Sequence, residues 1–258
     1  MLGVLDSGLG GLSVVRALRE RLPHQDVVFL ADQAHVPYGE REPEELGQLF
    51  GANVAWLNEA GVSAIVMGCN TSCAVGHTFG WPTSRAPILD LIDAAAAAAQ
   101  RAGIRRIGVI ATTATVKSGA YAQMLRARME GVRVTEVAAP ALVPLVEAGL
   151  TGTQQASAAV GAVCAKLPKD IDGVILGCTH YPFLDAHFSD ALGDGVLRID
   201  PASEQAARAS AMLPPNGAIG FGRTRYVTNG PDPEAFRTAV RVLTGELEPA
   251  CEPMAPRA

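Results

Sequence analysis

Residues 65–69, IVMGC, and residues 174–178, VILGC, decide the fold, because the same short motif occurs twice in the chain. Each is an apolar run of strand type that ends in Gly-Cys, and the two cysteines are 109 residues apart. A second pair, LGVL at 2–5 and IGVI at 107–110, repeats at a displacement of 105 residues. Two pairs at nearly one interval predict two similar α/β halves produced by duplication. The alternative is chance, because an apolar strand followed by glycine is common.

Short β-branched runs alternate with longer stretches rich in Ala, Leu and Arg along the chain. Continuous apolar strands between helices predict parallel sheets covered on both faces, so we expect the α/β class. The predicted strands are GVLDS, DVVFLAD, AIVMGCN, APILDLI, RIGVIAT, VRVTEVA, GVILGCT and GVLRIDP. The predicted helices cover 12–21, 44–59, 94–102, 119–129, 142–148, 154–166, 204–212 and 232–243. The Pro/Gly-rich stretch 214–222 is expected to be weakly packed, and 248–258 to be a frayed tail.

Composition excludes several classes of function. The 258 residues carry a formal net charge of −5 with no basic cluster, which argues against a nucleic-acid partner. Only Lys117, Lys166 and Lys169 are lysines, which weighs against a pyridoxal phosphate enzyme with its Schiff-base lysine. The first residues do not resemble a signal peptide, and no apolar stretch reaches membrane-spanning length, so we expect a cytoplasmic protein. Its five cysteines are then expected to be free thiols.

The segments GCNTS (68–72) and GCTHY (177–181) each place a thiol where a predicted strand ends. Ligands of open α/β sheets bind at the carboxyl ends of strands, so both segments are candidates for one cleft. If a helix begins just beyond the cysteine, its N-terminus favours a thiolate and attracts a carboxylate. The alternative for either cysteine alone is inert packing, since free cysteine is among the most buried residues.

A duplicated thiol suits racemisation, in which a proton leaves one face of a tetrahedral carbon and another returns to the opposite face. One thiol begins as thiolate and the other as thiol, and the roles exchange for the mirror-image substrate. Hydrogen bonds from Asn70, Thr71 and Thr179 to an α-carboxylate would stabilise the developing carbanion. The repeated motif therefore predicts an amino-acid racemase with Cys69 and Cys178 as its two bases.

The chain resembles the glutamate racemases of the cofactor-independent aspartate/glutamate racemase superfamily. The resemblance extends from about residue 2 to about residue 243. It implies two pseudosymmetric α/β domains with the active site in the cleft between them, no metal or organic cofactor, a homodimer, and supply of D-glutamate for peptidoglycan. The matching segments are LDSGLGGLSV (5–14), ADQAHVPYGE (31–40), GCNTS, ATTATVKSGAY (111–121), ALVPLVEAG (141–149), LGCTHYP (176–182) and RIDPA (198–202).

On this resemblance, residues 1–93 plus 206–258 form the domain that carries Cys69, and residues 94–205 form the domain that carries Cys178. The resemblance also implies the remaining roles, including those argued above for Asn70, Thr71 and Thr179. Asp6, His180 and Glu147 assist proton transfer; Asp6 and Ser7 contact the substrate; Tyr38 and Gly39 lie near its side-chain carboxylate; Asn70, Thr71, Thr179, His180 and Thr112 or Thr115 lie near its α-carboxylate or amine.

Simpler interpretations stay open for several of these residues. Asp6 can cap the helix that begins near Gly11, His180 can be a packed imidazole, and Glu147 can be a solvated helix residue. Tyr38 in VPYGE is typical of a turn. Three features depart from the family pattern: Cys73 replaces a smaller residue, LDLIDAA (89–95) replaces a Gly-Val-Ile segment followed by Pro-Gly, and His77 has no counterpart and is expected at the surface.

Four alternatives compete with glutamate racemisation. A nucleotide-binding α/β protein would use Gly8, Gly10 and Ser13 with Asp32 downstream, although Ser13 replaces the last glycine of that motif. A zinc site would use Cys69, Cys73, Cys178 and His180, whose spacing fits poorly. Cys-His hydrolase chemistry would leave Cys69 without a task. Within the superfamily, aspartate or another amino acid is the competing substrate.

Overall fold

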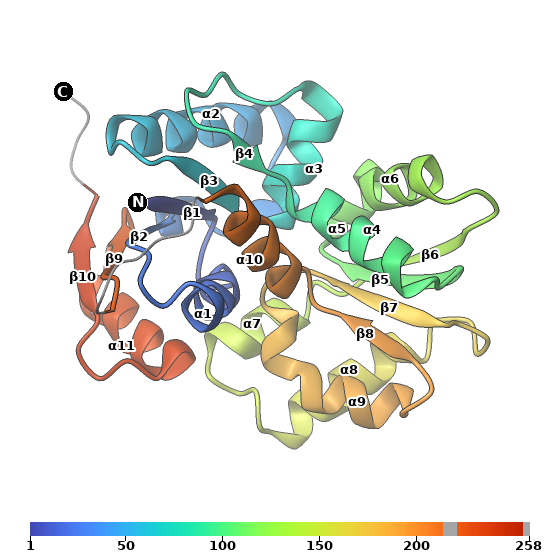
Figure 1. Cartoon of the computed structure of the whole chain (residues 1–258). Helices are drawn as coiled ribbons and strands as arrows, with labels where there is room; N and C mark the ends of the chain where they lie inside the picture. The colour runs from blue at the N-terminus through green and yellow to red at the C-terminus, as the bar shows by residue number, and fades with distance from the viewer. Residues whose placement is uncertain (214–220, 255–258) are drawn as a thin grey trace.

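The computed structural model describes residues 1–213 and 221–254, and within them it contains two β-sheets (Figure 1). One sheet has the strand order β10-β9-β2-β1-β3-β4 and the other has the order β6-β5-β7-β8, with every pair of neighbouring strands parallel. The strands are β1 (Leu2–Asp6), β2 (Val27–Ala31), β3 (Ala64–Met67), β4 (Ile88–Leu89), β5 (Arg106–Ala111), β6 (Arg133–Ala138), β7 (Gly173–Gly177), β8 (Leu197–Ile199), β9 (Thr224–Thr228) and β10 (Ala250–Pro253).

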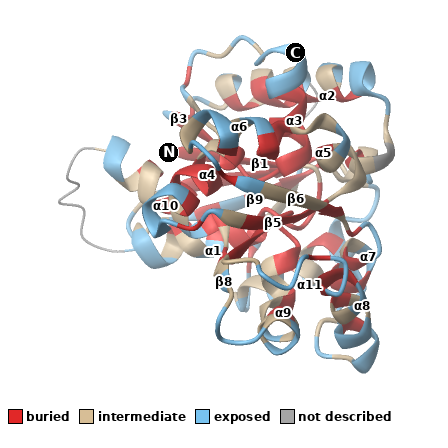
Figure 2. Ribbon diagram, turned by 90° about the vertical axis from the view of Figure 1, so that its right-hand side faces the viewer, coloured by how far each residue is buried: buried red, intermediate tan, exposed pale blue. Residues whose placement is uncertain are grey.

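Helices cover both faces of each sheet, which explains why the central strands are apolar throughout. In Figure 1, α2 lies on one side of the larger sheet and α1 with α11 on the other. Figure 2 shows the resulting buried interior between partly exposed helices. The helices are α1 (Leu12–Arg21), α2 (Pro43–Glu59), α3 (Asn70–Phe79), α4 (Leu91–Ala102), α5 (Thr113–Ser118), α6 (Ala120–Arg128), α7 (Leu142–Glu147), α8 (Gln154–Cys164), α9 (Asp185–Leu192), α10 (Pro201–Met212) and α11 (Pro233–Thr244), with 3₁₀ turns η1 (Gln33–His35), η2 (Tyr38–Glu40) and η3 (Tyr181–Leu184).

The two sheets repeat one arrangement. The order β2-β1-β3-β4 in the first corresponds strand for strand to β6-β5-β7-β8 in the second. The register corresponds too, because Gly3 pairs with Ile65 in the first sheet and Gly108 with Val174 in the second. The prediction of two pseudosymmetric α/β halves is therefore confirmed. The predicted domain limits at 93 and 206 fall inside α4 and α10 and stay a prediction.

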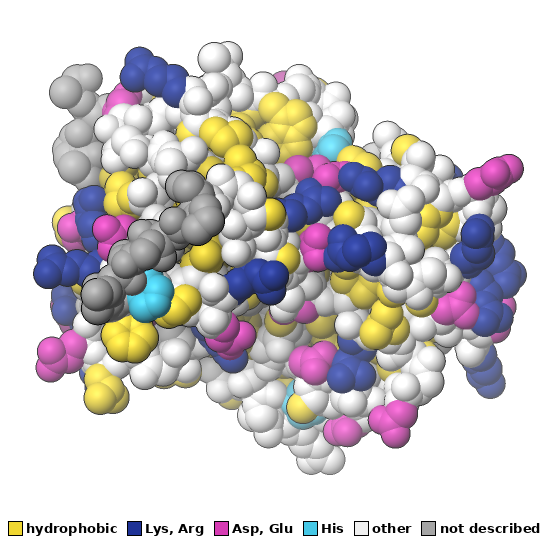
Figure 3. Space-filling model, in the orientation of Figure 1, with side chains coloured by type: hydrophobic (Ala, Val, Ile, Leu, Met, Phe, Trp, Pro, Cys, Tyr) yellow, Lys and Arg dark blue, Asp and Glu magenta, His cyan; other side chains and the backbone are white. Residues whose placement is uncertain are grey.

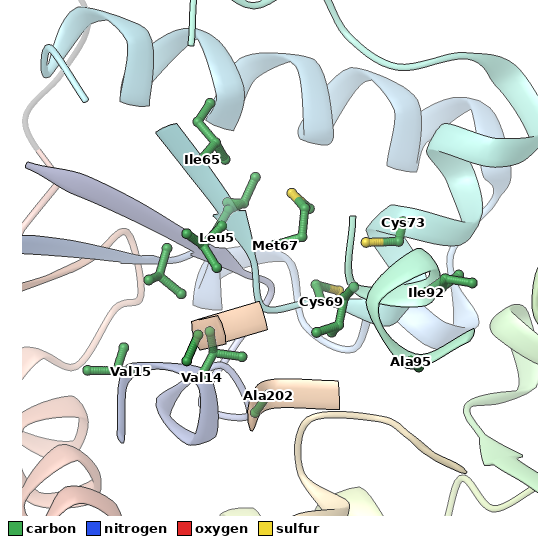
Figure 4. Close-up of a cluster of buried hydrophobic side chains, with 14 of the residues drawn as sticks. Leu5, Val14, Val15, Ile65, Met67, Cys69, Cys73, Ile92, Ala95 and Ala202 are labelled. Carbon is green, nitrogen blue, oxygen red and sulfur yellow. The ribbon is translucent and has the colours of Figure 1, made fainter. Parts of the chain in front are cut away.

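The core of the first half joins its central strands to the helices that cover them. Figure 4 shows side chains of β1 and β3 packed with side chains from α1, α4 and α10, and it places both Cys69 and Cys73 at this cluster. Polar contacts add to the packing, because Asp93 of α4 accepts hydrogen bonds from Arg128 of α6 and, at 2.7 Å, from Arg208 of α10. Helix α4 packs against both α6 and α10, and α10 also contacts β3 and the edge strand β4 of the larger sheet.

The C-terminal part of the chain corrects one expectation. The prediction of a frayed tail from residue 248 is wrong for Ala250–Pro253, which forms β10 and pairs in parallel with β9. Met254 continues the contact, since its backbone N–H donates to the carbonyl of Thr228 at 2.7 Å. Backbone hydrogen bonds to a neighbouring strand thus order a segment whose composition suggested none. Of the predicted weakly packed stretch 214–222, residues 214–220 lie outside the described residues.

The surface is mixed in charge. On the face drawn in Figure 3, Lys and Arg side chains are interspersed with Asp and Glu rather than gathered into one basic stripe. No helix within the described ranges has both the length and the apolar character needed to cross a membrane.

Candidate active site

One cavity of about 310 Å³ lies where strands of both halves end. It is lined by residues that follow β1 and β3 in the first half and β5 and β7 in the second, as expected for the carboxyl ends of parallel strands. Every predicted site residue except Thr115 lines this cavity: Asp6, Ser7, Tyr38, Gly39, Cys69, Asn70, Thr71, Thr112, Glu147, Cys178, Thr179 and His180. The structure thus brings the two thiols, 109 residues apart in sequence, to one site.

Cys69 follows β3 and is the N-cap residue of α3. Its Sγ accepts a hydrogen bond from the backbone N–H of Ser72 at 3.4 Å, and its S–H donates to Oγ of Ser7 at 3.6 Å. Burial raises the pKa of the Cys69 thiol to about 11, and the nearby Asp6 carboxylate adds to the rise while the hydrogen bonds oppose it. Cys69 is therefore a protonated thiol at neutral pH.

Cys178 follows β7 and has a different set of neighbours. Its Sγ lies 3.6 Å from Nδ1 of His180, and Nε2 of the same ring lies 3.1 Å from Oε1 of Glu147. Burial by itself lowers the pKa of His180, but its hydrogen bonds with Cys178 and Glu147 outweigh burial and raise the pKa to about 10. A positively charged imidazole thus lies between Sγ of Cys178 and the carboxylate of Glu147.

Asp6 ends β1 and organises the loop that leads to α1. Its Oδ2 accepts hydrogen bonds from the backbone N–H groups of Gly8 at 3.1 Å and Gly11 at 2.9 Å. Gly11 is the N-cap residue of α1, so the capping role and the cavity-lining position of Asp6 are both present. Burial raises the pKa of the Asp6 carboxyl, and the charge of His180 opposes that rise.

The β1–α1 loop also touches the loop that carries Cys178. A Cβ atom added at Gly10 would lie 2.5 Å from both Nδ1 of His180 and Oγ1 of Thr179. This space is therefore filled by protein atoms, which does not fit a pyrophosphate cradled by Gly8 and Gly10. Asp32 does not fit a ribose partner either, because its buried carboxylate accepts hydrogen bonds from Tyr38 and Asn53. Neither the pyrophosphate contact nor the ribose contact of the nucleotide-binding alternative fits this geometry.

Hydroxyl and amide groups from the two halves meet at the first turn of α3. Oγ1 of Thr71 lies 3.1 Å from Oγ1 of Thr112, the N-cap residue of α5, and Oγ1 of Thr112 lies 2.9 Å from that of Thr115. Thr115 is fully buried behind Thr112, so Thr112 is the one of the two that reaches the cavity. Asn70, beside Thr71, accepts a hydrogen bond from Tyr121.

Part of the cavity lining is apolar and was not predicted. Val36, Pro37, Pro140, Val143 and Pro144 line the cavity together with the predicted polar residues, and so does Thr113. Val36 and Pro37 belong to the motif VPYGE, which had been singled out from the sequence. The apolar residues of α7, in contrast, have the sequence pattern of an ordinary helix. Tyr38 is not in a simple turn but begins η2, where its hydroxyl donates to Asp32 and accepts from Asn53 at 3.2 Å.

The cysteine and histidine residues that depart from the family pattern lie outside this site. Cys73 is fully buried on α3 and does not line the cavity, and Nε2 of His77 lies 2.6 Å from Oδ2 of Asp90. The segment 89–95 begins α4, which Asp90 caps through the backbone N–H of Ile92. Among the described residues, no three His, Cys, Asp or Glu side chains converge as a metal site requires, which disfavours the zinc alternative.

Comparison with known proteins gives a consistent picture. Residues 12–209 match the family described as Asp/Glu/Hydantoin racemase. A glutamate racemase of Gloeobacter violaceus is 40% identical over 93% of this chain and 90% of its own length. The crystal structure of a glutamate racemase from Thermus thermophilus in complex with β-chloro-D-alanine has a TM-score of 0.83 at 35% identity, covering 98% of this chain and 95% of that one. A Francisella tularensis glutamate racemase in complex with D-glutamate has a TM-score of 0.87 at 26% identity, covering 98% and 97%.

Proposed function

The chain belongs to the Asp/Glu/hydantoin racemase family, and on that premise we propose that it interconverts L- and D-glutamate by proton transfer between Cys69 and Cys178. The observation that carries the proposal is that both thiols line one cavity, at equivalent strand ends of two pseudosymmetric halves. A volume of about 310 Å³ suits a small amino acid. Such an enzyme is an isomerase.

The reaction moves one proton off the substrate and another onto it. A thiolate on one side breaks the Cα–H bond and takes the proton, and the thiol on the other side gives its own proton to the opposite face of Cα. The two sulfurs end the cycle with exchanged protonation states. We assign proton donation to Cys69, which burial keeps as a thiol, and proton acceptance to Cys178, whose sulfur lies beside the ring of His180.

The carboxylates of the substrate would be bound mostly by neutral donors. No lysine or arginine is found among the described residues of the cavity wall. We assign the α-carboxylate and amine to Asn70, Thr71, Thr112, Thr179 and the loop after Asp6, and the side-chain carboxylate to the region of Tyr38 and Gly39. Preorganised hydrogen bonds in a buried cavity stabilise negative charge that develops in the transition state.

The cellular setting follows from the same proposal. Glutamate racemases supply D-glutamate for peptidoglycan, and the free cysteines of this chain are typical of the reducing cytoplasm. We infer that the enzyme works in the cytoplasm as a homodimer. Sedimentation of the purified protein tests its oligomeric state.

Racemisation is tested with D-glutamate in deuterated water, without added cofactor and with a chelator present. We expect loss of optical activity together with deuterium at Cα. Cys69→Ala and Cys178→Ala should each lower the rate by at least 10²- to 10⁴-fold, because each removes one of two acid–base groups that act in series. Cys164→Ala, a buried thiol of α8 outside the cavity, is the matched control and should keep its activity. Activity in either catalytic variant, activity on aspartate alone, or full loss with the chelator would contradict the proposal.

A further inference from the structure

Tyr121 is fully buried on α6 and links the two halves through its hydroxyl. This hydroxyl donates a hydrogen bond of 2.6 Å to Oδ1 of Asn70, which is the first residue of α3 and directly follows Cys69. Burial raises the pKa of Tyr121 well above its ordinary value, so the hydroxyl keeps the proton that it donates. One phenol of the second half therefore holds a side chain beside the thiol of the first half.

The ring of Tyr121 packs against the second cysteine loop as well. A Cβ atom added at Gly177 would lie 3.0 Å from Cε2 of Tyr121, and Gly177 directly precedes Cys178. Tyr121 thus contacts the residue after one thiol and the residue before the other. The rigid side chain of Tyr121 therefore fixes the distance between the loop that carries Cys69 and the loop that carries Cys178.

The amide nitrogen of Asn70 is the unusual feature of this contact. Nδ2 of Asn70 is buried and has no hydrogen-bond partner within the described part of the chain, although Asn70 lines the cavity. A buried donor without a partner is costly, and buried polar groups are normally satisfied. A substrate oxygen that approached this wall would satisfy it. Because the amide group is planar, the bond from Tyr121 to Oδ1 also fixes the direction of Nδ2.

We propose that Tyr121 is a positioning residue, which holds the Asn70 amide so that Nδ2 receives the α-carboxylate of the substrate between the two thiols. The inference rests on the proposed function for the identity of the substrate. The neighbouring hydroxyls of Thr71, Thr112 and Thr115 form a separate connection between the halves and do not bond to the Asn70 amide.

The test is the Tyr121→Phe variant, which keeps the ring and removes the hydroxyl. We expect KM for glutamate to rise about tenfold, because the carboxylate is already bound in the ground state, and kcat to fall no more than about threefold, because Thr71, Thr112 and Thr179 still donate to the charge that develops in the transition state. Tyr226→Phe is the matched control, since Tyr226 is also fully buried and donates to Oε1 of Glu246 at 2.5 Å in the larger sheet. It should lose a similar amount of thermal stability and keep its KM. An unchanged KM in Tyr121→Phe would overturn the proposal.

Two Asn70 variants separate positioning from a structural role. If Tyr121 acts through Asn70, the double variant Tyr121→Phe/Asn70→Ala has the KM of Asn70→Ala alone; independent effects would multiply instead. The Asn70→Asp variant keeps an acceptor for the Tyr121 hydroxyl but loses Nδ2, so its KM for glutamate should rise at least tenfold. This variant tests the assignment of Nδ2 even if Tyr121→Phe does not fold. An unchanged KM in Asn70→Asp would refute that assignment. If the wild-type protein racemises glutamate and Tyr121→Phe has the wild-type KM, only the role of Tyr121 is rejected. If the wild-type protein is inactive on glutamate, the proposed function itself is rejected.

Discussion

Substitution of Gly10 by alanine is a sensitive test of the proposed site, because this glycine faces the loop of the other half that carries Cys178. The added Cβ would lie 2.5 Å from Nδ1 of His180 and from Oγ1 of Thr179, whereas ordinary contact begins near 3.4 Å. One side must therefore move by about 0.9 Å. Gly10 is not among the glycines with positive φ, so the alanine backbone is unstrained and the collision is the whole perturbation.

The expected loss follows from that displacement. A misplacement of about 1 Å in a catalytic group costs about 10²-fold in rate, which corresponds to about 2.7 kcal/mol in the activation free energy. We expect kcat/KM of Gly10→Ala to fall by this factor, since Nδ1 of His180 is the group that contacts Cys178. The fall must be equal for L- and D-glutamate, because enantiomers have equal free energy and the equilibrium constant of racemisation is 1.

Polarimetry from both enantiomers measures the effect. The control is Gly51→Ala on α2, where an added Cβ meets nothing within 4 Å, and this variant should keep its activity with slightly higher stability. A kcat/KM within twofold of wild type in Gly10→Ala would refute the link between loop spacing and catalysis. So would a crystal structure in which His180 has not moved although activity is lost.

Two further predictions concern the thiol environment and the C-terminal strand. Alkylation of Cys69 by iodoacetamide, followed by peptide mass spectrometry, should accelerate about tenfold per pH unit from pH 7 to 10 and level off near the pKa of about 11, because only the thiolate reacts. Asp6→Asn should speed this alkylation at pH 8, since the Asp6 charge raises the pKa of Cys69; an equal or slower rate would contradict that assignment. Deletion of residues 249–258 should lower the free energy of unfolding by about 2 kcal/mol and Tm by about 5 °C, because β10 loses its hydrogen bonds to β9, while racemisation persists. An unchanged Tm would mean that β10 adds no stability.

Much of the fold was predictable because its signal is local. The apolar runs of β1, β3, β5 and β7 are visible in sequence, and so is their repetition. Helix α3 was missed because NTSCAVGHTF lacks helical periodicity; the Cys69 sulfur caps it and the surrounding core buries it. Strands β9 and β10 were missed because neither is a continuous apolar run; β9 is as long as β1, and both are ordered by pairing, β9 with β2 and β10 with β9.

The candidate site was predictable only in part. The pattern of Cys69 and Cys178 follows from the chemistry of a two-sided proton transfer, but the other polar residues came from family resemblance. Contacts such as Gly10 with His180, or Tyr121 with Asn70, join segments that are 51 or more residues apart and leave no periodic trace. These contacts are determined by side-chain packing between the two halves, which local sequence propensities do not predict.

The shared register of the two central strand pairs has a consequence for how such an enzyme arises. If one half was duplicated and fused, as the repeated motif predicts, its precursor paired two copies with one thiol each about a twofold axis. That ancestor treats both ends of a bound molecule alike, whereas an amino acid has unlike ends. Tyr38 on one side, and His180 with Glu147 on the other, line the cavity and differ between the halves, so we expect these groups to distinguish the two ends of the bound molecule.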